Sequence, residues 1–178
     1  MDNSNSQVES LFFQADQKIK EGLFAEAKDL LRQAITLDPK FGRAYNHLGW
    51  LYETKYQDYK KAEELYRQAL EFSPEYPAIY INLAILLSTL EKNQELEKHL
   101  QKALTVLGIN KSSIYREFGF LYERQGLFDK AIESFKNGLL YSLTDDETEK
   151  FKLAIERCKQ KQEIIGNIPA ATKSGAKK

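Results

Sequence analysis

The sequence predicts an all-α protein built from antiparallel helix pairs that stack on one another. Its 178 residues include only 9 Gly and 4 Pro but ten Phe and ten Tyr, a composition that favours helices packed through aromatic side chains. Large and small apolar residues recur at helical spacing, and the same pattern returns four times along the chain. Because neither helix of a pair can bury its apolar face alone, neighbouring pairs are expected to stack.

The first helix pair is expected at residues 8–41, after a disordered segment at 1–6. Ser6 and Glu9 have the spacing of a capping box, which predicts that the first helix starts there. The motif Gly-Leu-Phe at 22–24 precedes the second helix of this pair, and it returns 104 residues later. Its glycine is expected to make the tight turn between the two helices of a pair.

The second and fourth pairs, expected at 42–76 and 112–145, share the clearest pattern. Each first helix reads Tyr-x-x-large-Gly-x-x-Tyr, once at 45–52 and once at 115–122. Each second helix carries Ala and an aromatic residue four positions apart. The third pair, expected at 77–111, keeps the same register with a more divergent sequence.

Two single-residue insertions disturb an otherwise regular repeat. One lies in the sequence KYQDY at 55–59, between the two helices of the second pair. The other lies in GINKSS at 108–113, between the third and fourth pairs. Both fall where turns are expected, and turns accommodate added residues at little cost in free energy.

An additional helix is expected to close the C-terminal end, at residues 144–163. Thr144 and Glu147 form a second capping-box pattern, and helical periodicity continues to about Gln162. The remaining residues, 164–178, are expected to form a flexible tail. One face of this helix is apolar and the rest is polar, as expected for a helix that caps a stack of repeats; the apolar residues are Phe151, Ala154, Ile155 and Cys158.

The spaced positions of residues 7–143 resemble the tetratricopeptide repeat (TPR), in which large and small side chains interlock along two antiparallel helices. The resemblance implies a right-handed solenoid of helix pairs with a concave groove that binds extended or helical peptides. Two positions depart from the pattern: Lys18 stands where Tyr is usual, and Gly108 replaces the terminal Pro. The implied function is that of a non-enzymatic adaptor or scaffold for protein–protein interaction.

The resemblance also implies which residues line the groove, because they occupy the unpacked positions of each first helix. Trp50, Ile85 and Phe120 hold the same position in successive repeats, and we expect them to form an apolar row that docks a partner helix or peptide. An alternative is that this row only thickens the contact between neighbouring first helices. The full set of expected partner-binding residues is Phe12, Phe13, Asp16, Arg43, Asn46, His47, Trp50, Ile81, Asn82, Ile85, Arg116, Phe120 and Arg124.

Composition argues against other classes of function. The 26 basic and 26 acidic residues balance, which disfavours nucleic acid and anionic membranes as partners. His47 and His99 have no metal-ligand spacing, and Cys158 lies on the apolar face of the capping helix, so no metal, cofactor or catalytic residue is expected. The N-terminal residues do not resemble a secretory signal, and no apolar run could span a bilayer. A cytoplasmic protein is expected.

Two other functions stay open at the sequence level. Ile164, Ile165 and Ile168 follow the capping helix and would suit self-assembly into homo-oligomers through the terminal helix or tail. A frayed helix end is the simpler explanation of the same three residues. An accessory subunit of a larger complex is the other alternative, although no particular residue points to it.

Overall fold

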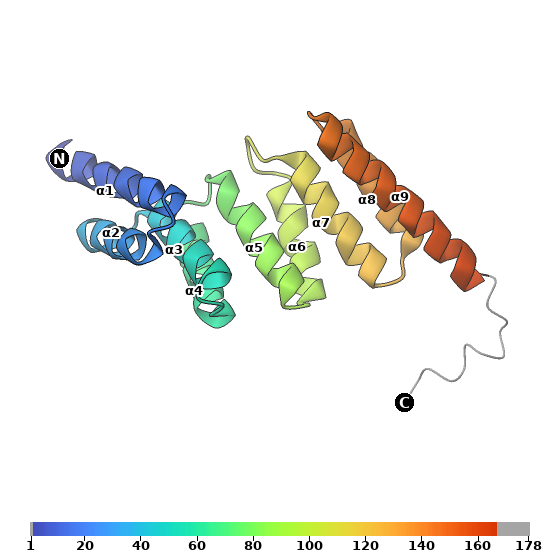
Figure 1. Cartoon of the computed structure of the whole chain (residues 1–178), viewed down its shortest axis with the longest axis horizontal. Helices are drawn as coiled ribbons and strands as arrows, with labels where there is room; N and C mark the ends of the chain where they lie inside the picture. The colour runs from blue at the N-terminus through green and yellow to red at the C-terminus, as the bar shows by residue number, and fades with distance from the viewer. Residues whose placement is uncertain (1, 167–178) are drawn as a thin grey trace. The chain divides into compact units, whose positions relative to one another are not determined.

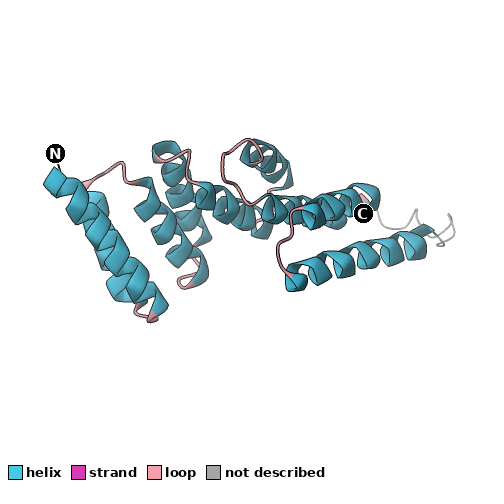
Figure 2. Ribbon diagram, turned by 90° about the horizontal axis from the view of Figure 1, so that it is seen from above, coloured by secondary structure: helices cyan, strands magenta, loops and turns pink. Residues whose placement is uncertain are grey.

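The computed structural model describes residues 2–166, and every regular element in this range is an α-helix (Figures 1 and 2). Short loops join the helices (Figure 2). In chain order the helices are α1 (Asp2–Lys20), α2 (Phe24–Leu37), α3 (Gly42–Thr54), α4 (Tyr59–Phe72), α5 (Pro77–Thr89), α6 (Asn93–Ala103), α7 (Lys111–Arg124), α8 (Phe128–Leu140) and α9 (Asp145–Gly166). The predicted all-α fold of four helix pairs and a further helix is confirmed for the described residues.

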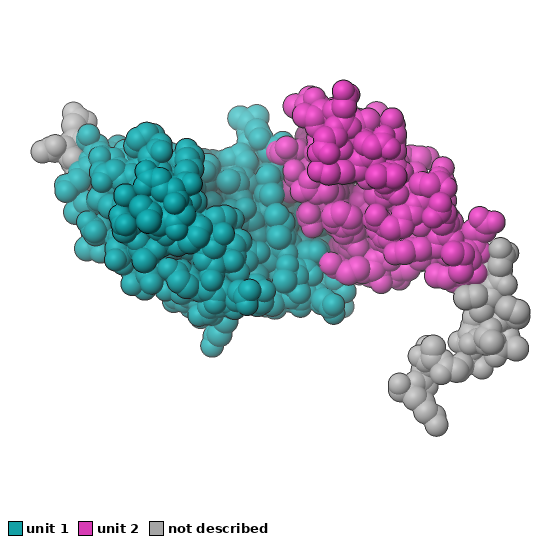
Figure 3. Space-filling view, viewed as in Figure 1, with its two compact units in different colours: residues 1–109 teal, residues 110–178 magenta. Residues whose placement is uncertain are grey.

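The chain divides into two compact units, 1–109 and 110–178 (Figure 3). The N-terminal unit contains three helix pairs, α1–α2, α3–α4 and α5–α6. The C-terminal unit contains the pair α7–α8 and the terminal helix α9. The border between the units falls within the segment 108–113, where the sequence predicted an insertion.

Small residues let the helices of each unit approach closely. In the N-terminal unit Gly49 of α3 lies against the ring of Tyr66 on α4, and a Cβ atom at this glycine would lie 2.8 Å from that ring. In the C-terminal unit Gly119 lies in the same way against Phe135, where an added Cβ would overlap the ring. The large–small alternation seen in the sequence therefore corresponds to rings packed over glycines.

The predicted glycine turns are present. Gly22 and Gly126 have φ values of 78° and 73°, in the left-handed region that favours glycine. In each turn the residue after the glycine donates a backbone hydrogen bond to a carbonyl five residues earlier, as Leu23 does to Lys18 over 2.8 Å. In the third pair Glu91 takes this conformation, with a φ of 54°.

The two insertions lengthen turns as predicted. In the second pair the corresponding hydrogen bond runs from Asp58 to Tyr52 over 2.9 Å and spans one more residue than in the other pairs. Gln57 has a φ of 53° in this wider turn. The second insertion lies in the connection 104–110, which follows an α6 that ends at Ala103. This connection is longer than the four-residue connections that precede α3 and α5.

The terminal helix α9 packs on α8 and buries the apolar face that the sequence predicted (Figure 1). Phe151, Ala154 and Cys158 are buried, and Ile155 packs beside them. A Cβ atom at Gly138 of α8 would overlap the ring of Phe151. This contact repeats, between α8 and α9, the ring-on-glycine packing found within the helix pairs.

Both predicted capping boxes differ from the structure in part. Thr144 Oγ1 accepts a hydrogen bond from the Glu147 backbone N–H over 3.2 Å, as expected, but the Glu147 carboxylate accepts from Leu143 N–H and not from Thr144. At the other end, α1 begins at Asp2, so the predicted helix start at Ser6 is wrong. No Gly or Pro interrupts residues 2–6, and the helix extends through them.

The terminal helix α9 also extends further than the sequence predicted. The helix continues past Gln162 to Gly166, and it includes Ile164 and Ile165, which the sequence assigned to the tail. Lys and Gln residues near Gln162 are good helix formers, so helical hydrogen bonding continues until Gly166. Ile168 and the predicted tail from 167 onward lie outside the described residues.

Candidate functional site

The predicted groove residues contribute to two hollows, one in each unit. Five of them line a cavity of about 240 Å³ in the N-terminal unit, here called the N-hollow. Two others, Arg116 and Phe120, line a cavity of about 260 Å³ in the C-terminal unit, here called the C-hollow. Residues outside the lining of both hollows are Phe12, Phe13, Arg43, Ile81, Ile85 and Arg124.

The N-hollow is formed by the first helices of three successive pairs. Its walls come from α1, α3 and α5, whose exposed faces follow one another because the pairs repeat the same packing. Three lining residues, Ile19, Tyr76 and Ala78, were not among the groove residues predicted from the sequence. One of them, Ala78, occupies an expected groove position at the start of α5. The lining residues are Asp16, Ile19, Asn46, His47, Trp50, Tyr76, Ala78 and Asn82.

A pair of amide side chains lies in the wall of the N-hollow. Asn82 of α5 donates a hydrogen bond from Nδ2 to Oδ1 of Asn46 on α3, over 3.0 Å. Asn46 is 2% exposed, so this bond satisfies a buried carbonyl oxygen and fixes both side chains. Asn82 is only half-buried and keeps one N–H and its carbonyl oxygen for a ligand. The sequence predicted Asn82 as a peptide contact but gave no sign of its partner.

His47 lies beside this amide pair as a neutral side chain. Its Nδ1 is 3.2 Å from the Arg43 carbonyl oxygen, to which it can donate a hydrogen bond, and its ring packs edge-on to Phe12. Burial lowers the pKa of His47 below its ordinary value, against the opposing effects of the Arg43 carbonyl and Asp16. Nε2 lies 3.9 Å from Asp16 Oδ1. With Nδ1 as the donor, Nε2 is a hydrogen-bond acceptor.

Asp16 adds a carboxylate to the N-hollow, and Lys20 binds it over 2.7 Å on the same helix. Both side chains are accessible to solvent, so this pair is weak and a ligand can displace the lysine. Together, Asp16, His47 and Asn82 give the hollow three acceptor groups.

Trp50 provides the apolar wall, and it is partly buried against the core of the N-terminal unit. Lys55 Nζ lies 5.4 Å from the centre of its ring. Of the predicted apolar row, Ile85 is 38% exposed and Phe120 is 36% exposed. Trp50 and Ile85 belong to one unit and Phe120 to the other, so a continuous row stays a prediction.

Arg43 is engaged within the N-terminal unit. Its guanidinium pairs with Glu9 and lies against two rings, 4.9 Å from the centre of Phe12 and 4.8 Å from that of Phe41. Phe12 and Arg43, which the sequence assigned to partner binding, thus contact each other within the chain. Phe13, by contrast, is 63% exposed.

The C-hollow has one wall that the sequence did not predict. Arg116 and Phe120 come from α7, Phe135 comes from α8, and all the other lining residues come from α9. The sequence assigned α9 only a capping role, because its buried stripe was the clear signal. Exposed residues beside that stripe complete the hollow together with two members of the stripe, Phe151 and Ala154. The α9 contribution is Glu147, Lys150, Phe151, Leu153, Ala154 and Arg157.

A partly buried carboxylate anchors α9 to α7. Glu123 accepts two hydrogen bonds from Arg157, over 2.7 and 2.6 Å, and a third from Lys161 over 2.7 Å. The bond from Arg157, helped by that from Lys161, outweighs the effect of burial and lowers the pKa of Glu123 to about 2. The arrangement fixes Arg157 at the edge of the C-hollow.

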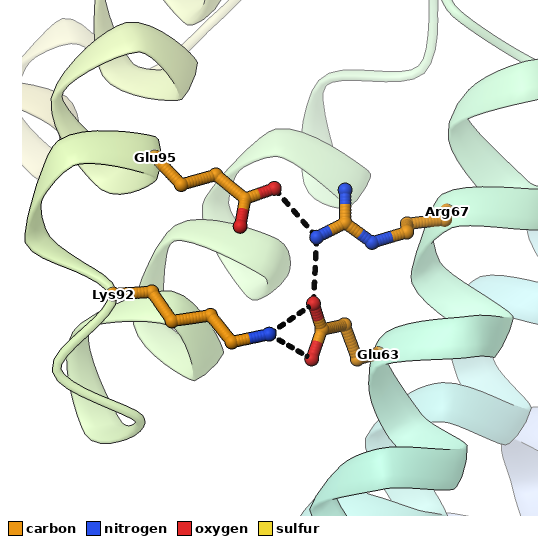
Figure 4. Close-up of polar contacts among 4 residues, drawn as sticks. All are labelled: Glu63, Arg67, Lys92 and Glu95. Atoms are coloured by element: carbon orange, nitrogen blue, oxygen red, sulfur yellow. Dashed lines mark hydrogen bonds and ion pairs between the residues drawn. The ribbon is translucent and has the colours of Figure 1, made fainter.

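A second ion-pair network joins helix pairs in the N-terminal unit (Figure 4). Glu63 of α4 accepts hydrogen bonds from Arg67 and from Lys92, and Arg67 also donates to Glu95 of α6 (Figure 4). Burial alone would raise the pKa of Glu63, but the two cationic donors lower it. This network links the second and third pairs through their second helices and leaves the N-hollow residues free of it.

Residues with catalytic potential are engaged in packing. Cys158 is fully buried, and burial raises the pKa of its thiol. His99 is buried, and its Nε2 lies 2.9 Å from the Tyr80 carbonyl oxygen. Within residues 2–166, no group of three or more His, Cys, Asp or Glu side chains is placed to hold a metal ion. In the same range no helix has the length and apolar character needed to cross a bilayer.

Comparisons with known proteins agree with this architecture. The tetratricopeptide repeat family model matches residues 14–77. Among solved structures, PilF of Pseudomonas aeruginosa superposes with a TM-score of 0.79 at 19% identity, covering 90% of this chain and 71% of PilF. YrrB, a TPR protein with an unusual peptide-binding site, gives 0.69 at 20% identity, covering 91% and 84%. MamA gives 0.67 at 22% identity, covering 75% and 77%.

The comparison with curated proteins gave no match. At these identities the solved structures establish a common fold and no more. Residues 14–77 therefore match the tetratricopeptide repeat family, and the described residues as a whole share the fold of these solved structures, with four helix pairs and a further helix.

Proposed function

We propose that this protein is a non-enzymatic interaction adaptor that binds a segment of a partner protein in the N-hollow. The observation that carries this proposal is the amide pair Asn46–Asn82 in the wall of the hollow, in which a buried Asn46 holds the half-buried side chain of Asn82. An amide side chain can both donate to and accept from a peptide main chain, so it can hold an extended segment of varied sequence.

The other lining residues define which segment fits best. Trp50 and Ile19 give one apolar wall, suited to an aliphatic or aromatic side chain. Asp16 and the neutral His47 contribute acceptors, which favour a ligand rich in N–H donors, such as main-chain amides beside a Lys or Arg side chain. A cavity of about 240 Å³ accommodates a side chain and the adjoining main chain of a longer segment.

The fold gives general support to an interaction role. YrrB, which shares this fold, is a TPR protein with an unusual peptide-binding site. The shared fold does not transfer the ligand of YrrB to this chain, because the two are 20% identical. The chemistry of the N-hollow therefore defines the proposed ligand.

The test uses a blocking substitution with a matched control. Peptides are selected on the full-length protein from a displayed library, and the affinity of the best peptide is then measured for Ala78→Arg and for Ser113→Arg. Ala78 lines the N-hollow, and Ser113 holds the same repeat position in the C-terminal unit. We expect Ala78→Arg to weaken binding about tenfold or more, with Ser113→Arg unchanged. Equal affinities for both variants would contradict the proposal.

Self-assembly is a second candidate function, favoured by one observation. Ile164 and Ile165 at the end of α9 are 63% and 45% exposed. Replacing both by Ser should convert an oligomer into a monomer in light scattering if these side chains join two copies. A full-length protein that is already monomeric at high concentration would exclude this function.

A further inference from the structure

We infer that α9 is a binding element as well as a cap, and that the C-hollow docks a partner segment with a large apolar side chain flanked by carboxylates. This is a second site, separate in its residues from the N-hollow, and it is not required by the proposed function above. Its lining combines rings from α7 and α8 with an exposed face of α9.

The base and one wall of the C-hollow are apolar. Phe120 and Phe135 meet edge-on with ring centres 5.5 Å apart, and Phe151 lies 6.3 Å from Phe135. Leu153 of α9 is 59% exposed at this hollow, although a helix that only capped the stack would carry polar residues on its outer face. An aromatic or branched aliphatic side chain in the hollow would cover both Leu153 and Phe120.

The charged residues of the hollow determine which ligand groups are favoured beside the apolar side chain of the ligand. Three cations line it, Arg116, Lys150 and Arg157, and among the described lining residues Glu147 is the one carboxylate. Both oxygens of Glu147 are occupied inside the unit, one by Ser112 Oγ over 2.7 Å and the other by the backbone N–H of residue 143 over 3.4 Å. The cationic groups are therefore complementary to carboxylates on a ligand.

The acidic partners of all three cations lie outside the lining of the hollow. Asp146 pairs with Lys150 over 2.6 Å, and both side chains are exposed to solvent, so this pair is weak. Glu117 is 3.6 Å from Arg116, and Glu123 binds Arg157; each carboxylate side chain is 9% exposed, against 36% and 44% for the arginines. Arg157 uses two of its five N–H donors on Glu123 and keeps the others. Because Glu123 holds this guanidinium in place, less conformational entropy is lost when a ligand binds it.

The test titrates the full-length, ¹⁵N-labelled protein with three synthetic peptides that are acetylated and amidated at their ends. The first is Gly-Ser-Glu-Glu-Phe-Glu-Glu-Ser-Gly; the second has Ala in place of Phe, and the third has Lys in place of every Glu. We expect the first peptide to shift the amide resonances of Phe120 and Leu153, and to bind about tenfold more tightly than the other two. Its affinity should fall as NaCl is raised to about 0.5 M.

A pair of charge reversals on α9 supplies the control. Lys150→Glu should weaken the first peptide about fivefold, because Lys150 lines the hollow. Lys152→Glu changes the same charge on the same helix outside the lining and should leave the affinity unchanged. Equal affinities for the three peptides, equal effects of the two reversals, or shifts confined to Trp50 and Asn82 would each overturn the inference. Equal affinities for the three peptides, or equal effects of the two reversals, would leave the proposal for the N-hollow untouched.

Discussion

The two hollows use equivalent repeat positions and have different chemistry. The N-hollow has a neutral imidazole, a fixed amide pair and a carboxylate, whereas the C-hollow has rings bordered by cations. Part of the difference arises at two positions that line both hollows, which carry Asn46 and Trp50 in α3 and Arg116 and Phe120 in α7.

This contrast shows which positions of the repeat the fold constrains. Gly49 and Gly119 are both fixed by an overlying ring, and their units keep the same packing there. Positions on the exposed face have no such constraint, so their chemistry can differ from one pair to the next. One scaffold can thus offer two ligand preferences.

The largest expected effect tests the common packing of the two units. Gly119→Val should lower the free energy of unfolding by about 3 kcal/mol, because the new side chain would overlap Phe135. Chemical denaturation measures the loss. Gly22→Asn is the control, since Asn tolerates the left-handed conformation and an added Cβ there meets no atom within 4 Å; it should cost less than about 1 kcal/mol. Similar losses for the two variants would contradict the packing account.

The next largest effect tests how strongly Glu123 holds α9 on the rest of the C-terminal unit. Glu123→Gln should destabilise this unit by about 2 kcal/mol at neutral pH, because two cationic donors lose their carboxylate. Hydrogen exchange should show the loss first in α9, as faster exchange of its amides. Glu149→Gln, which changes an exposed carboxylate on α9, should have little effect.

The same carboxylate predicts a pH dependence. The pKa of Glu123 is about 2 in the folded protein and near the ordinary 4.5 when unfolded, so the unfolded state binds more protons between these values. Its contribution to stability is therefore complete above pH 4.5 and is lost as the pH falls toward 2. Unfolding curves of Glu123→Gln should lack this part of the acid dependence. An identical dependence in both proteins would exclude the anchor.

A crossed pair of substitutions sharpens the comparison of the hollows. Trp50→Ala should weaken a peptide selected for the N-hollow about tenfold and change binding of the acidic Phe peptide by less than about twofold. Phe120→Ala should do the reverse. Both proteins should stay folded by circular dichroism, because both side chains are partly exposed. Parallel losses at both sites from either change would indicate one shared surface.

The smallest expected effect concerns His47. Burial lowers its pKa below 6.5, against the opposing effects of the Arg43 carbonyl and the Asp16 carboxylate, so the ring is neutral at pH 7. The unfolded state then binds the proton more readily, and stability falls slightly as the pH drops below 6.5. An NMR titration of the imidazole should give a midpoint below that of a histidine in an unstructured peptide. A midpoint at or above that value would contradict a neutral acceptor in the N-hollow.

Most of the fold could be predicted from the sequence because the repeat constrains it. Gly49 and Gly119 each precede a ring in the second helix of their pair, by 17 and 16 residues, and the additional residue in KYQDY produces the wider turn observed at Gln57. Local patterns were less reliable at the ends. The Ser6 cap did not stop α1 from starting at Asp2, since a capping residue favours a helix start without preventing extension.

The candidate sites could be predicted only in part. The resemblance to the repeat assigned Asn46, His47, Trp50 and Asn82 to the groove, but it could not show that Asn82 binds a buried Asn46 across two helices. The C-hollow was missed because Leu153 and its neighbours on α9 follow no repeat position. Their proximity to Phe120 depends on how α9 packs, which the anchor at Glu123 helps to fix.

The central claim is that a partner segment occupies the N-hollow, and the single tryptophan of the chain reports on it directly. Trp50 lines this hollow, so its indole resonance and the side-chain amide resonances of Asn46 and Asn82 should shift together as a selected peptide is added. The shifts should saturate at the Kd measured independently by calorimetry. Saturating binding that leaves all three resonances unchanged would contradict the account.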